Sequence, residues 1–285
     1  MDQLGHVNNV TYVDYLQEAR VDMFREHAPE RGGEELAEGV VVVRHEVQYV
    51  APLVFRREPV SVEVWATEIR AASFTLACEV FDETDDGRQV YLRARSLLTP
   101  YVFDTQRPRR LTEQERAVLN GFLEPADDPL RPTVEVGEAS PDQTHTYDCA
   151  VRFSDIDPFG HVNNVKYFEY FQEARIAHVA GLGRLLSGEG PEDEATGVVV
   201  AQVDVDYRSP MLLREEPYAV TTWVAGVGSS SFVIEGEISD GESVVSRSRV
   251  VMVAFDAAKQ RSARLSERQR ELLRTGGRLE NAPAR

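Results

Sequence analysis

The chain has 285 residues, of which 42% are apolar and 28% charged, a balance typical of a globular protein with enough apolar material for one large core or two ordinary ones. Its formal net charge of −17 argues against a nucleic-acid or anionic-membrane partner, because phosphate binding depends on Lys and Arg. No apolar run is long enough to span a membrane, and Cys78 and Cys149 lack metal spacing, so we expect a cytoplasmic protein.

A duplicated segment sets the expected architecture. Residues 2–20 match residues 157–175 at 13 of 19 positions with a constant offset of 155. Later matches follow at an offset of 158, including Trp65 with Trp223. The period is too long for a solenoid repeat, so the sequence predicts two copies of one domain. We expect domain 1 at residues 1–123, a linker at 124–143 rich in Pro, Asp, Glu and Gly, and domain 2 at 144–285.

Each copy predicts the same order of elements. A helix comes first, at 9–26 and at 164–180, and in the second copy its polar strip is narrow, which is typical of a helix enclosed by a sheet. Four strands rich in β-branched and aromatic residues follow, near 40–50, 58–69, 73–82 and 89–102, and near 197–208, 216–227, 231–239 and 243–255. Asp-Gly pairs at 86–87 and 240–241 predict turns. A short helix capped by Thr112 or Ser266 ends each copy.

Only the second copy has a predicted strand ahead of the duplicated motif, at 144–153. The first copy begins at Met1-Asp2, where that strand is missing. Two interpretations compete: the native chain starts upstream of Met1, or the first copy is naturally one strand short. We favour the first, because losing the strand exposes a sheet edge and leaves Asp2 on a fraying terminus.

The segment from Phe153 to Arg175 contains an ordered motif: an Asp, the run Gly-His-Val-Asn-Asn and an aromatic-rich helix. It resembles the signature of the 4-hydroxybenzoyl-CoA thioesterase-like family, and the His-Val-Asn-Asn form is also similar to long-chain acyl-CoA and plant-type acyl-ACP thioesterases. The resemblance covers nearly the whole chain, twice. It implies an α+β fold of two tandem hotdog domains, each a long central helix wrapped by an antiparallel sheet. It also implies that the two domains pair as an intrachain pseudo-dimer and that such chains assemble into a homo-oligomer.

Thioester hydrolysis needs a carboxylate, as nucleophile or as general base, and donors for the oxyanion. The resemblance assigns the carboxylate to Asp157 and, in the first copy, to Asp2. The simpler alternative is an Asp that caps the turn and the following helix. Asp155 ranks lower, because the residues after it do not match the family spacing.

Side chains after the Asp are the next candidates. His161 and Asn163 correspond to catalytic positions of the acyl-ACP relatives, or they form a network that fixes the loop, and we weigh these interpretations equally. Their counterparts in the first copy are His6 and Asn8. The weaker substrate-binding candidates are Gly160, Asn164, Tyr167, Asp206 and Arg208.

Asp206 lies where the acyl-ACP enzymes have an acidic residue, whereas the first copy has Gln48 there. We slightly favour an outward-facing strand residue at this position. Arginines are the natural candidates for coenzyme A phosphates, although each is more simply a solvated surface charge. They are Arg93, Arg95, Arg208, Arg214, Arg247 and Arg249.

No zinc-protease, Cys-x-x-Cys, phosphate-loop, dinucleotide or nucleophile-elbow motif occurs in the required context. We therefore expect no metal and no redox cofactor, with coenzyme A present only as part of the substrate. The leading hypothesis is hydrolysis of medium or long acyl-CoA thioesters. Two alternatives stay open: an acyl-ACP thioesterase, which the acidic charge disfavours, and a hotdog protein that binds acyl or aromatic ligands without catalysis.

Overall fold

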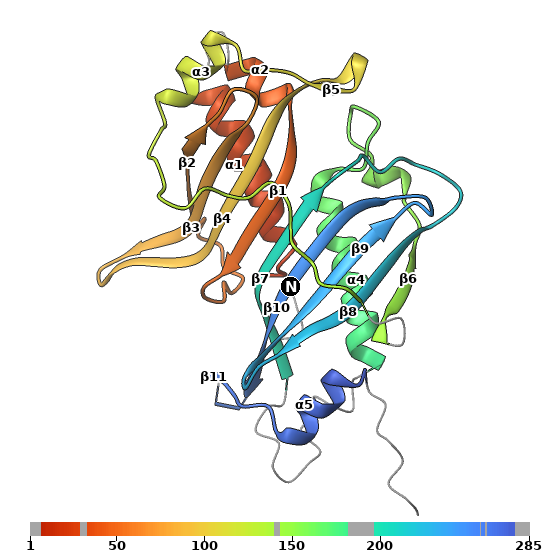
Figure 1. Ribbon diagram of the computed structural model, residues 1–285. Helices are drawn as coiled ribbons and strands as arrows, with labels where there is room; N and C mark the ends of the chain where they lie inside the picture. Colours follow the sequence, from red (N-terminus) through yellow and green to blue (C-terminus); the bar gives the residue numbers. More distant parts are fainter. Residues whose placement is uncertain are drawn as a thin grey trace, which may run out of the picture. The chain divides into compact units, whose positions relative to one another are not determined.

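The computed structural model describes residues 7–28, 33–139, 143–181, 197–256, 258–259 and 261–276. The chain divides into two compact units, Met1–Thr133 and Val134–Arg285. The boundary falls inside the segment 124–143 that the sequence predicts as a linker. Each unit combines one long helix with an antiparallel sheet, the α+β arrangement predicted for each copy (Figure 1).

Unit 1 begins with helices α1 (Thr11–Glu26) and α2 (Gly33–Glu38). The strands β1 (Val40–Tyr49), β2 (Ser61–Ile69), β3 (Phe74–Thr84) and β4 (Gly87–Val102) follow, then η1 (Phe103–Thr105), β5 (Arg107–Pro108) and α3 (Glu113–Asn120). The long strands pair antiparallel in the order β2-β3-β4-β1, and β5 pairs with β4. These strands lie close to their predicted positions, whereas α2 has no counterpart among the predicted elements.

Unit 2 begins with β6 (His145–Cys149), η3 (Phe153–Asp155) and α4 (Asn164–Gly181). The strands β7 (Gly197–Tyr207), β8 (Tyr218–Val227), β9 (Ser231–Ser239), β10 (Val244–Asp256) and β11 (Arg261–Ser262) follow, and α5 (Glu267–Arg274) is last. The sheet order is β7-β10-β9-β8-β6, antiparallel throughout, with β11 on β10. The predicted leading strand of the second copy is therefore present as β6.

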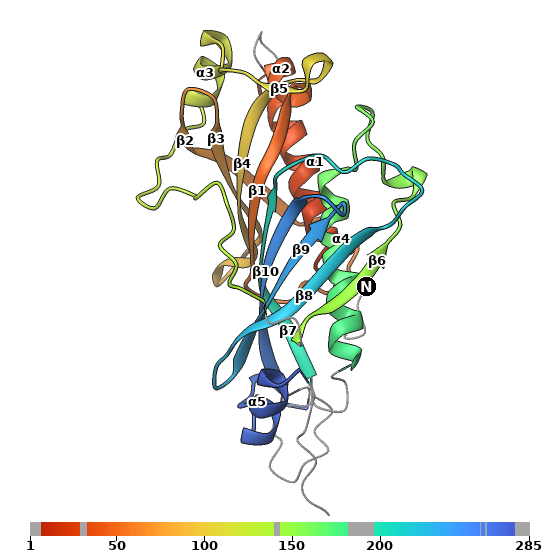
Figure 2. The same ribbon diagram turned by 45° about the vertical axis from the view of Figure 1, so that its right-hand side comes forward.

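The long helix of each unit lies against its own sheet (Figures 1 and 2), and the side chains that it buries are mainly apolar. The buried side chains of α1 are Tyr12, Val13, Leu16, Met23 and Phe24. Those of α4 include Val165, Tyr167, Phe168, Tyr170, Phe171 and Ala174. Burial of such side chains provides the main stabilisation of each unit. Among the described residues, no helix is both long enough and apolar enough to cross a membrane.

The predicted caps and turns are confirmed. The hydroxyl of Thr112 accepts the N–H of Glu115 at 3.1 Å, and that of Ser266 accepts the N–H of Gln269 at 3.2 Å. Each bond satisfies one of the free N–H groups of a helix start. Gly87, the first residue of β4 after the turn at 85–86, has a φ of 111°, a conformation that favours glycine.

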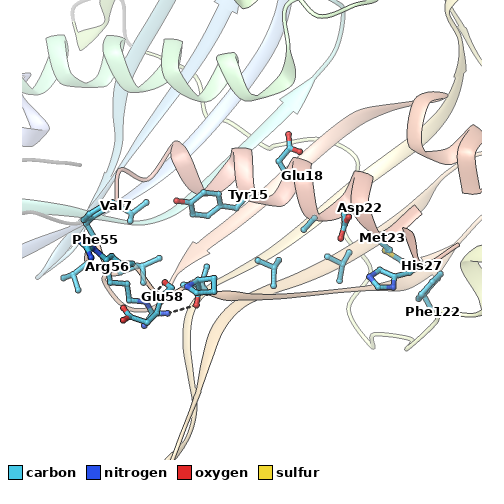
Figure 3. Close-up of a pocket in the computed structure, with 18 residues that line it drawn as sticks. Val7, Tyr15, Glu18, Asp22, Met23, His27, Phe55, Arg56, Glu58 and Phe122 are labelled. Carbon is cyan, nitrogen blue, oxygen red and sulfur yellow. Dashed lines mark hydrogen bonds between the residues drawn. The ribbon is translucent and has the colours of Figure 1, made fainter. Parts of the chain in front are cut away.

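The two units differ at one edge of the sheet. In unit 2, β6 pairs with the outer edge of β8, from His145 opposite Thr222 to Cys149 opposite Tyr218. In unit 1, β2 is the counterpart of β8, and no other strand in the described part of the chain pairs with its outer edge. A hollow of about 790 Å³ lies there, lined by α1, β2 and the loop between β1 and β2 (Figure 3).

Two histidines connect β6 to the rest of unit 2. The rings of His145 and His178 stack with centroids 5.5 Å apart, and Nδ1 of His178 lies 3.0 Å from the hydroxyl oxygen of Thr222 on β8. Burial, followed by the neighbouring His145, lowers the pKa of His178 from 6.5 to about 4. The imidazole of His178 is therefore neutral in the folded unit at neutral pH.

We predict that unit 2 loses stability as the pH falls from about 6.5 toward 4. The unfolded chain takes up a proton on His178 near pH 6.5, whereas the folded chain resists it until about pH 4, so the unfolded state binds more protons in this window. One such proton lowers the free energy of unfolding by at most about 1.4 kcal/mol per pH unit. Urea unfolding of the wild type and of His178→Gln, measured at pH 7 and pH 5, should show a smaller pH effect in the variant. His27→Gln, which changes an exposed histidine, is the control and should show the pH effect of the wild type. If the free energy of unfolding of His178→Gln falls with pH as much as that of the wild type, the assignment to His178 is wrong.

Candidate active site

Asp157 lies in a tight turn between η3 and α4. Its Oδ1 accepts the N–H groups of Phe159 at 2.9 Å and His161 at 3.1 Å. Gly160 donates its N–H to the carbonyl of Asp157 at 3.1 Å and has a φ of 84°, which explains the glycine at this position. The carboxylate is half-buried, and because both bonds end on Oδ1, the turn leaves Oδ2 available.

Backbone bonds close the base of this turn. The N–H of Asp157 donates to the carbonyl of His161 at 2.8 Å, and the N–H of Asn163 donates to the carbonyl of Asp155 at 2.8 Å. The N–H of Val162 donates to the carbonyl of Met211, in the loop after β7, at 2.9 Å. The turn is therefore anchored both to its own chain and to a second loop of unit 2.

Asp155 has a different environment from Asp157. It is buried, and its Oδ2 accepts the hydroxyl of Tyr170 at 2.7 Å and the N–H of Arg152 at 2.9 Å. Burial and this bond to Asp155 raise the pKa of Tyr170, so the hydroxyl remains a donor. Asp155 ties the start of the turn to α4, which agrees with its lower rank as a catalytic candidate.

Asn163 acts as a cap for α4. Its Oδ1 accepts the N–H of Val165 at 3.0 Å, so the amide oxygen is used by the fold. The amide nitrogen of Asn163 remains as a donor, because the cap fixes which end of the amide faces the helix. His161, half-buried, stands between Asp157 and Asn163 in the turn. The catalytic roles of both side chains stay predictions.

Asn164 and Tyr167 hold the first turn of α4 in place. The hydroxyl of Tyr207 on β7 donates to the carbonyl of Asn164 at 3.0 Å. The hydroxyl of Tyr167 accepts the N–H of Met211 at 2.9 Å, and burial raises the pKa of Tyr167. These bonds involve the backbone of Asn164 and the side chain of Tyr167, and the contact of both residues with substrate stays a prediction.

Unit 1 repeats this arrangement. Oδ1 of Asn8 accepts the N–H of Val10 at 2.9 Å, and the hydroxyl of Tyr49 donates to the carbonyl of Asn9 at 2.8 Å. The two bonds between the helix and the next loop recur from Leu53 to Tyr12 and from Val7 to Leu53. The predicted catalytic residues Asp2 and His6 lie outside the described residues.

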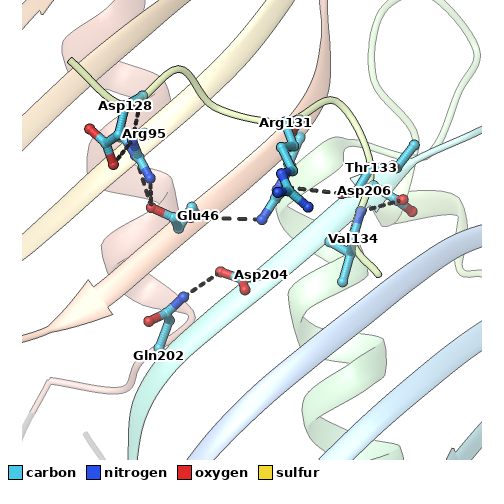
Figure 4. A network of polar contacts seen from close by, with 10 residues as sticks. Glu46, Arg95, Asp128, Arg131, Thr133, Val134, Gln202, Asp204 and Asp206 are labelled. Carbon is cyan, nitrogen blue, oxygen red and sulfur yellow. Dashed lines mark hydrogen bonds and ion pairs between the residues drawn. The ribbon is translucent and has the colours of Figure 1, made fainter. Parts of the chain in front are cut away.

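Asp206 lies on the face of β7 opposite α4, where the connecting segment covers it. It is 1% exposed, and its two oxygens accept the N–H groups of Val134 at 2.9 Å and Arg247 at 3.0 Å. Figure 4 shows the bond to Val134. Burial raises the pKa of Asp206. The carboxylate thus fixes the segment that leads into unit 2. The neighbouring Tyr207 contacts Tyr167 of α4, so Asp206 faces away from the helix, as the outward-facing interpretation has it, but the connecting segment covers it.

The basic candidates for coenzyme A phosphates already have partners. Arg95 Nη2 lies 2.6 Å from Glu46, and its Nη1 lies 3.0 Å from Asp128 (Figure 4). Arg214 donates to three backbone carbonyls around the start of β8. The remaining pairs are Arg93 with Glu79, Arg208 with Asp206, Arg247 with Glu237 and Arg249 with Glu235. A phosphate at any of these arginines has to compete with an acid or a carbonyl that is already present.

Exposed apolar side chains lie beside the Asp157 turn. Phe159 is 46% exposed in the turn, and Leu212 and Leu213 are 46% and 51% exposed in the loop joined to it through Met211. This loop is not among the sites predicted from the sequence. A visible signal was the run Met211-Leu-Leu directly after Pro210, because consecutive exposed apolar residues in a loop often mark a contact surface.

Comparison with known proteins places these features in a family. The model of the thioesterase-like superfamily matches residues 1–122 and 151–273. The uncharacterised protein YsmA of Bacillus subtilis strain 168 is 33% identical over 126 residues, which cover 44% of this chain and 81% of that protein.

Two solved structures share the fold over both units. A protein described as an oleoyl thioesterase of Lactobacillus plantarum has a TM-score of 0.68 at 18% identity, covering 89% of this chain and 91% of its own. The 12:0-ACP thioesterase of Umbellularia californica has a TM-score of 0.65 at 18% identity, covering 89% and 93%. The two tandem hotdog units predicted from the sequence are thereby confirmed.

The bond between Tyr170 and Asp155 provides a test of how the turn is held. We predict that Tyr170→Phe lowers the free energy of unfolding by about 2 kcal/mol, because it leaves a buried carboxylate without its charged hydrogen bond. Tyr15 is the matched position in unit 1 and lines the open hollow, so Tyr15→Phe should cost under about 0.5 kcal/mol. Urea unfolding of both variants measures the difference. Equal effects would show that the Asp155 bond contributes nothing particular.

Proposed function

Because the chain belongs to the thioesterase-like superfamily, we propose that it hydrolyses acyl-CoA thioesters to a free acid and coenzyme A, with Asp157 as the catalytic carboxylate. The observation that carries the proposal is the Asp157 turn. Two backbone N–H groups fix one carboxylate oxygen, and the second oxygen is left for chemistry. Of the two acids in the motif, only Asp157 combines this fixed position with partial exposure, whereas Asp155 is buried.

Asp157 can serve hydrolysis in two ways. As a general base, it takes a proton from a water molecule that attacks the carbonyl carbon, and the thiolate of coenzyme A leaves. As a nucleophile, it attacks the carbonyl carbon and expels the thiolate of coenzyme A to form a mixed anhydride with the acyl group, which water then cleaves to release the acid and regenerate the carboxylate. Both routes need Oδ2 to be ionised and within reach of the substrate, and both remain part of the proposal.

The oxyanion needs a donor, and the turn limits the choice. The backbone N–H groups from Phe159 to Asn163 all donate within the turn or to neighbouring loops. They are therefore occupied when the thioester arrives. The amide nitrogen of Asn163, directed by the cap on Val165, is our preferred donor, with the His161 ring as the second candidate.

The acyl group is the remaining part of the substrate. The exposed side chains of Phe159, Leu212 and Leu213 offer an apolar surface next to the proposed carboxylate. Covering it with an acyl chain is favourable by about 25 cal/mol per Å² of apolar area removed from water. This supports an acyl rather than a small polar thioester.

We predict that Asp157→Asn reduces kcat for acyl-CoA hydrolysis by at least about 100-fold without unfolding the protein, because Asn keeps the turn acceptor but loses the charge. Release of coenzyme A thiol across a panel of acyl chain lengths measures this. Asp148→Asn, which changes an exposed acid on β6, is the control and should leave kcat unchanged. If Asp157→Asn matches the wild type, the assignment of the carboxylate is wrong. If the wild type hydrolyses no acyl-CoA or acyl-ACP, ligand binding without catalysis is favoured.

An acyl-ACP substrate is the second candidate, and the shared fold with the 12:0-ACP thioesterase of Umbellularia californica supports it. The net charge of −17 disfavours it, because like-charged proteins associate slowly. We predict that kcat/KM for an acyl-CoA exceeds that for the acyl-ACP of the same chain length by at least about tenfold at low salt. Added salt should narrow the gap by screening the repulsion. A higher kcat/KM for acyl-ACP at every salt concentration would reverse the substrate assignment.

A further inference from the structure

Three places in the sequence put an Asp or Asn directly before a glycine, where the glycine nitrogen can attack the preceding side chain and close a ring. They are Asp86-Gly87, Asn120-Gly121 and Asp240-Gly241. Glycine favours the attack because it has no side chain in the way and allows the widest range of backbone angles. By sequence alone Asn120 is the most reactive, because its amide is neutral, whereas a carboxylate must take up a proton before water can leave. The two aspartates are alike by this criterion.

The fold of unit 2 holds both reacting groups at Asp240. Oδ1 of Asp240 accepts the N–H groups of Ser243 at 2.8 Å and Glu242 at 2.9 Å. The attacking nitrogen is occupied as well, since the N–H of Gly241 donates to the hydroxyl of Ser239 at 3.1 Å. The backbone bonds from Ser243 and Glu242 lower the pKa of Asp240, so less of its carboxyl is in the protonated form from which water leaves. Attack at Asp240 therefore requires these bonds to break first.

Asn120 is protected in a different way, because it is the last residue of α3. The N–H of Gly121 donates to the carbonyls of Val118 at 3.0 Å and Ala117 at 3.3 Å. Gly121 keeps helical backbone angles, with φ −64° and ψ −21°, and the carbonyl of Asn120 accepts the N–H of Leu123 at 3.4 Å. Ring closure at Asn120 therefore requires the end of the helix to unwind, although its sequence is the most reactive of the three.

Asp86 lacks both kinds of protection. It is exposed in the turn at 85–86 between β3 and β4. Within the described part of the chain, no hydrogen bond or ion pair holds its carboxylate. Gly87 lies opposite Thr84 in the last residue pair of the β3–β4 ladder, and the end of a ladder opens more readily than its middle. The side chain of Asp86 can therefore rotate toward the nitrogen of Gly87 without first losing a partner.

We propose that Asp86 is a modification site at which isoaspartate forms in the folded protein, ahead of Asn120 and Asp240. The nitrogen of Gly87 attacks Cγ of Asp86, and its proton leaves with the carboxyl hydroxyl as water, which gives a succinimide ring. Water then opens the ring. Cleavage of the bond to the original backbone carbonyl gives isoaspartate, and cleavage of the bond to Cγ restores aspartate. No oxidant or reductant takes part, and the site does not depend on the proposed catalytic activity.

The test keeps the folded full chain at neutral pH for several weeks and then maps its tryptic peptides by mass spectrometry with electron-transfer fragmentation, which distinguishes isoaspartate from aspartate. We expect at least about fivefold more isoaspartate at Asp86 than at Asp240, because the bonds to Asp240 must break before attack. Synthetic peptides report the reactivity of each sequence without the fold, and they cover residues 82–90, 116–124 and 236–244. In the peptides Asn120 should react first, and Asp86 and Asp240 should react at similar rates.

Two variants of the turn identify the reacting side chain. Asp86→Glu keeps the charge but can close only a larger ring, which forms more slowly, so the product should disappear. Asp85→Glu, the matched change of the exposed neighbour, should retain it. The assignment is wrong if isoaspartate in the folded chain forms first at Asn120 or Asp240, or in equal amounts at Asp86 and Asp240. It is also wrong if Asp86 resists while its peptide reacts, or if Asp86→Glu retains the product. Should a variant fail to fold, the ranking of the three sites in the wild type decides.

Discussion

Each unit depends on fixing the first turn of a long buried helix, where backbone N–H groups have no partner within the helix. Asn163 in unit 2 and Asn8 in unit 1 supply a side-chain acceptor at this point. A tyrosine from the first long strand, Tyr207 or Tyr49, binds the carbonyl of the next residue. Because the same bonds recur in both units, the fold uses the side chain of the first Asn of the pair and the backbone carbonyl of the second, whether or not a unit performs chemistry.

The way the fold holds the start of the long helix explains why Asp155 and Asp157, two residues apart, have different roles. Asp155 faces the interior, where an ionised carboxylate is costly unless it is hydrogen-bonded, and Tyr170 with the N–H of Arg152 meets that need. Asp157 sits on the turn that this anchor holds, with one oxygen bound by the backbone. A fixed carboxylate with one open oxygen is the arrangement that a base or nucleophile needs. The turn holds Asp157 in this position because the buried Asp155 anchors its start to α4.

Much of the fold could be predicted from the sequence, because each element predicted in one copy could be checked against its counterpart in the other copy. The strands and the capping residues Thr112 and Ser266 follow from local patterns, whereas the preference for Asp157 over Asp155 rests on the family resemblance. The surroundings of Asp206 could not be predicted, since strand alternation shows which face a residue is on but not which distant segment covers that face. The same limit applies to the arginine partners, which come from neighbouring strands and the segment after α3. The roles of His161 and Asn163 remain open for another reason: capping and catalysis favour the same residue types.

The segment between the units explains why unit 2 has Asp206 where unit 1 has Gln48, and no catalytic role is needed for the explanation. In unit 1, Arg44 donates from Nη1 to the carbonyls of Arg131 and Thr133, at 2.9 Å each. In unit 2, Asp206 accepts the N–H of Val134. A cation therefore binds backbone carbonyls in one unit, and a carboxylate binds a backbone N–H in the other, while the matching position of Asp206 in unit 1 is the exposed Gln48. Since a buried carboxylate needs such donors to be stable, Asp206 occurs only in the copy where this segment supplies one. The difference between the copies at this position thus follows from the path of the connecting segment, and it is no argument that unit 2 alone is active.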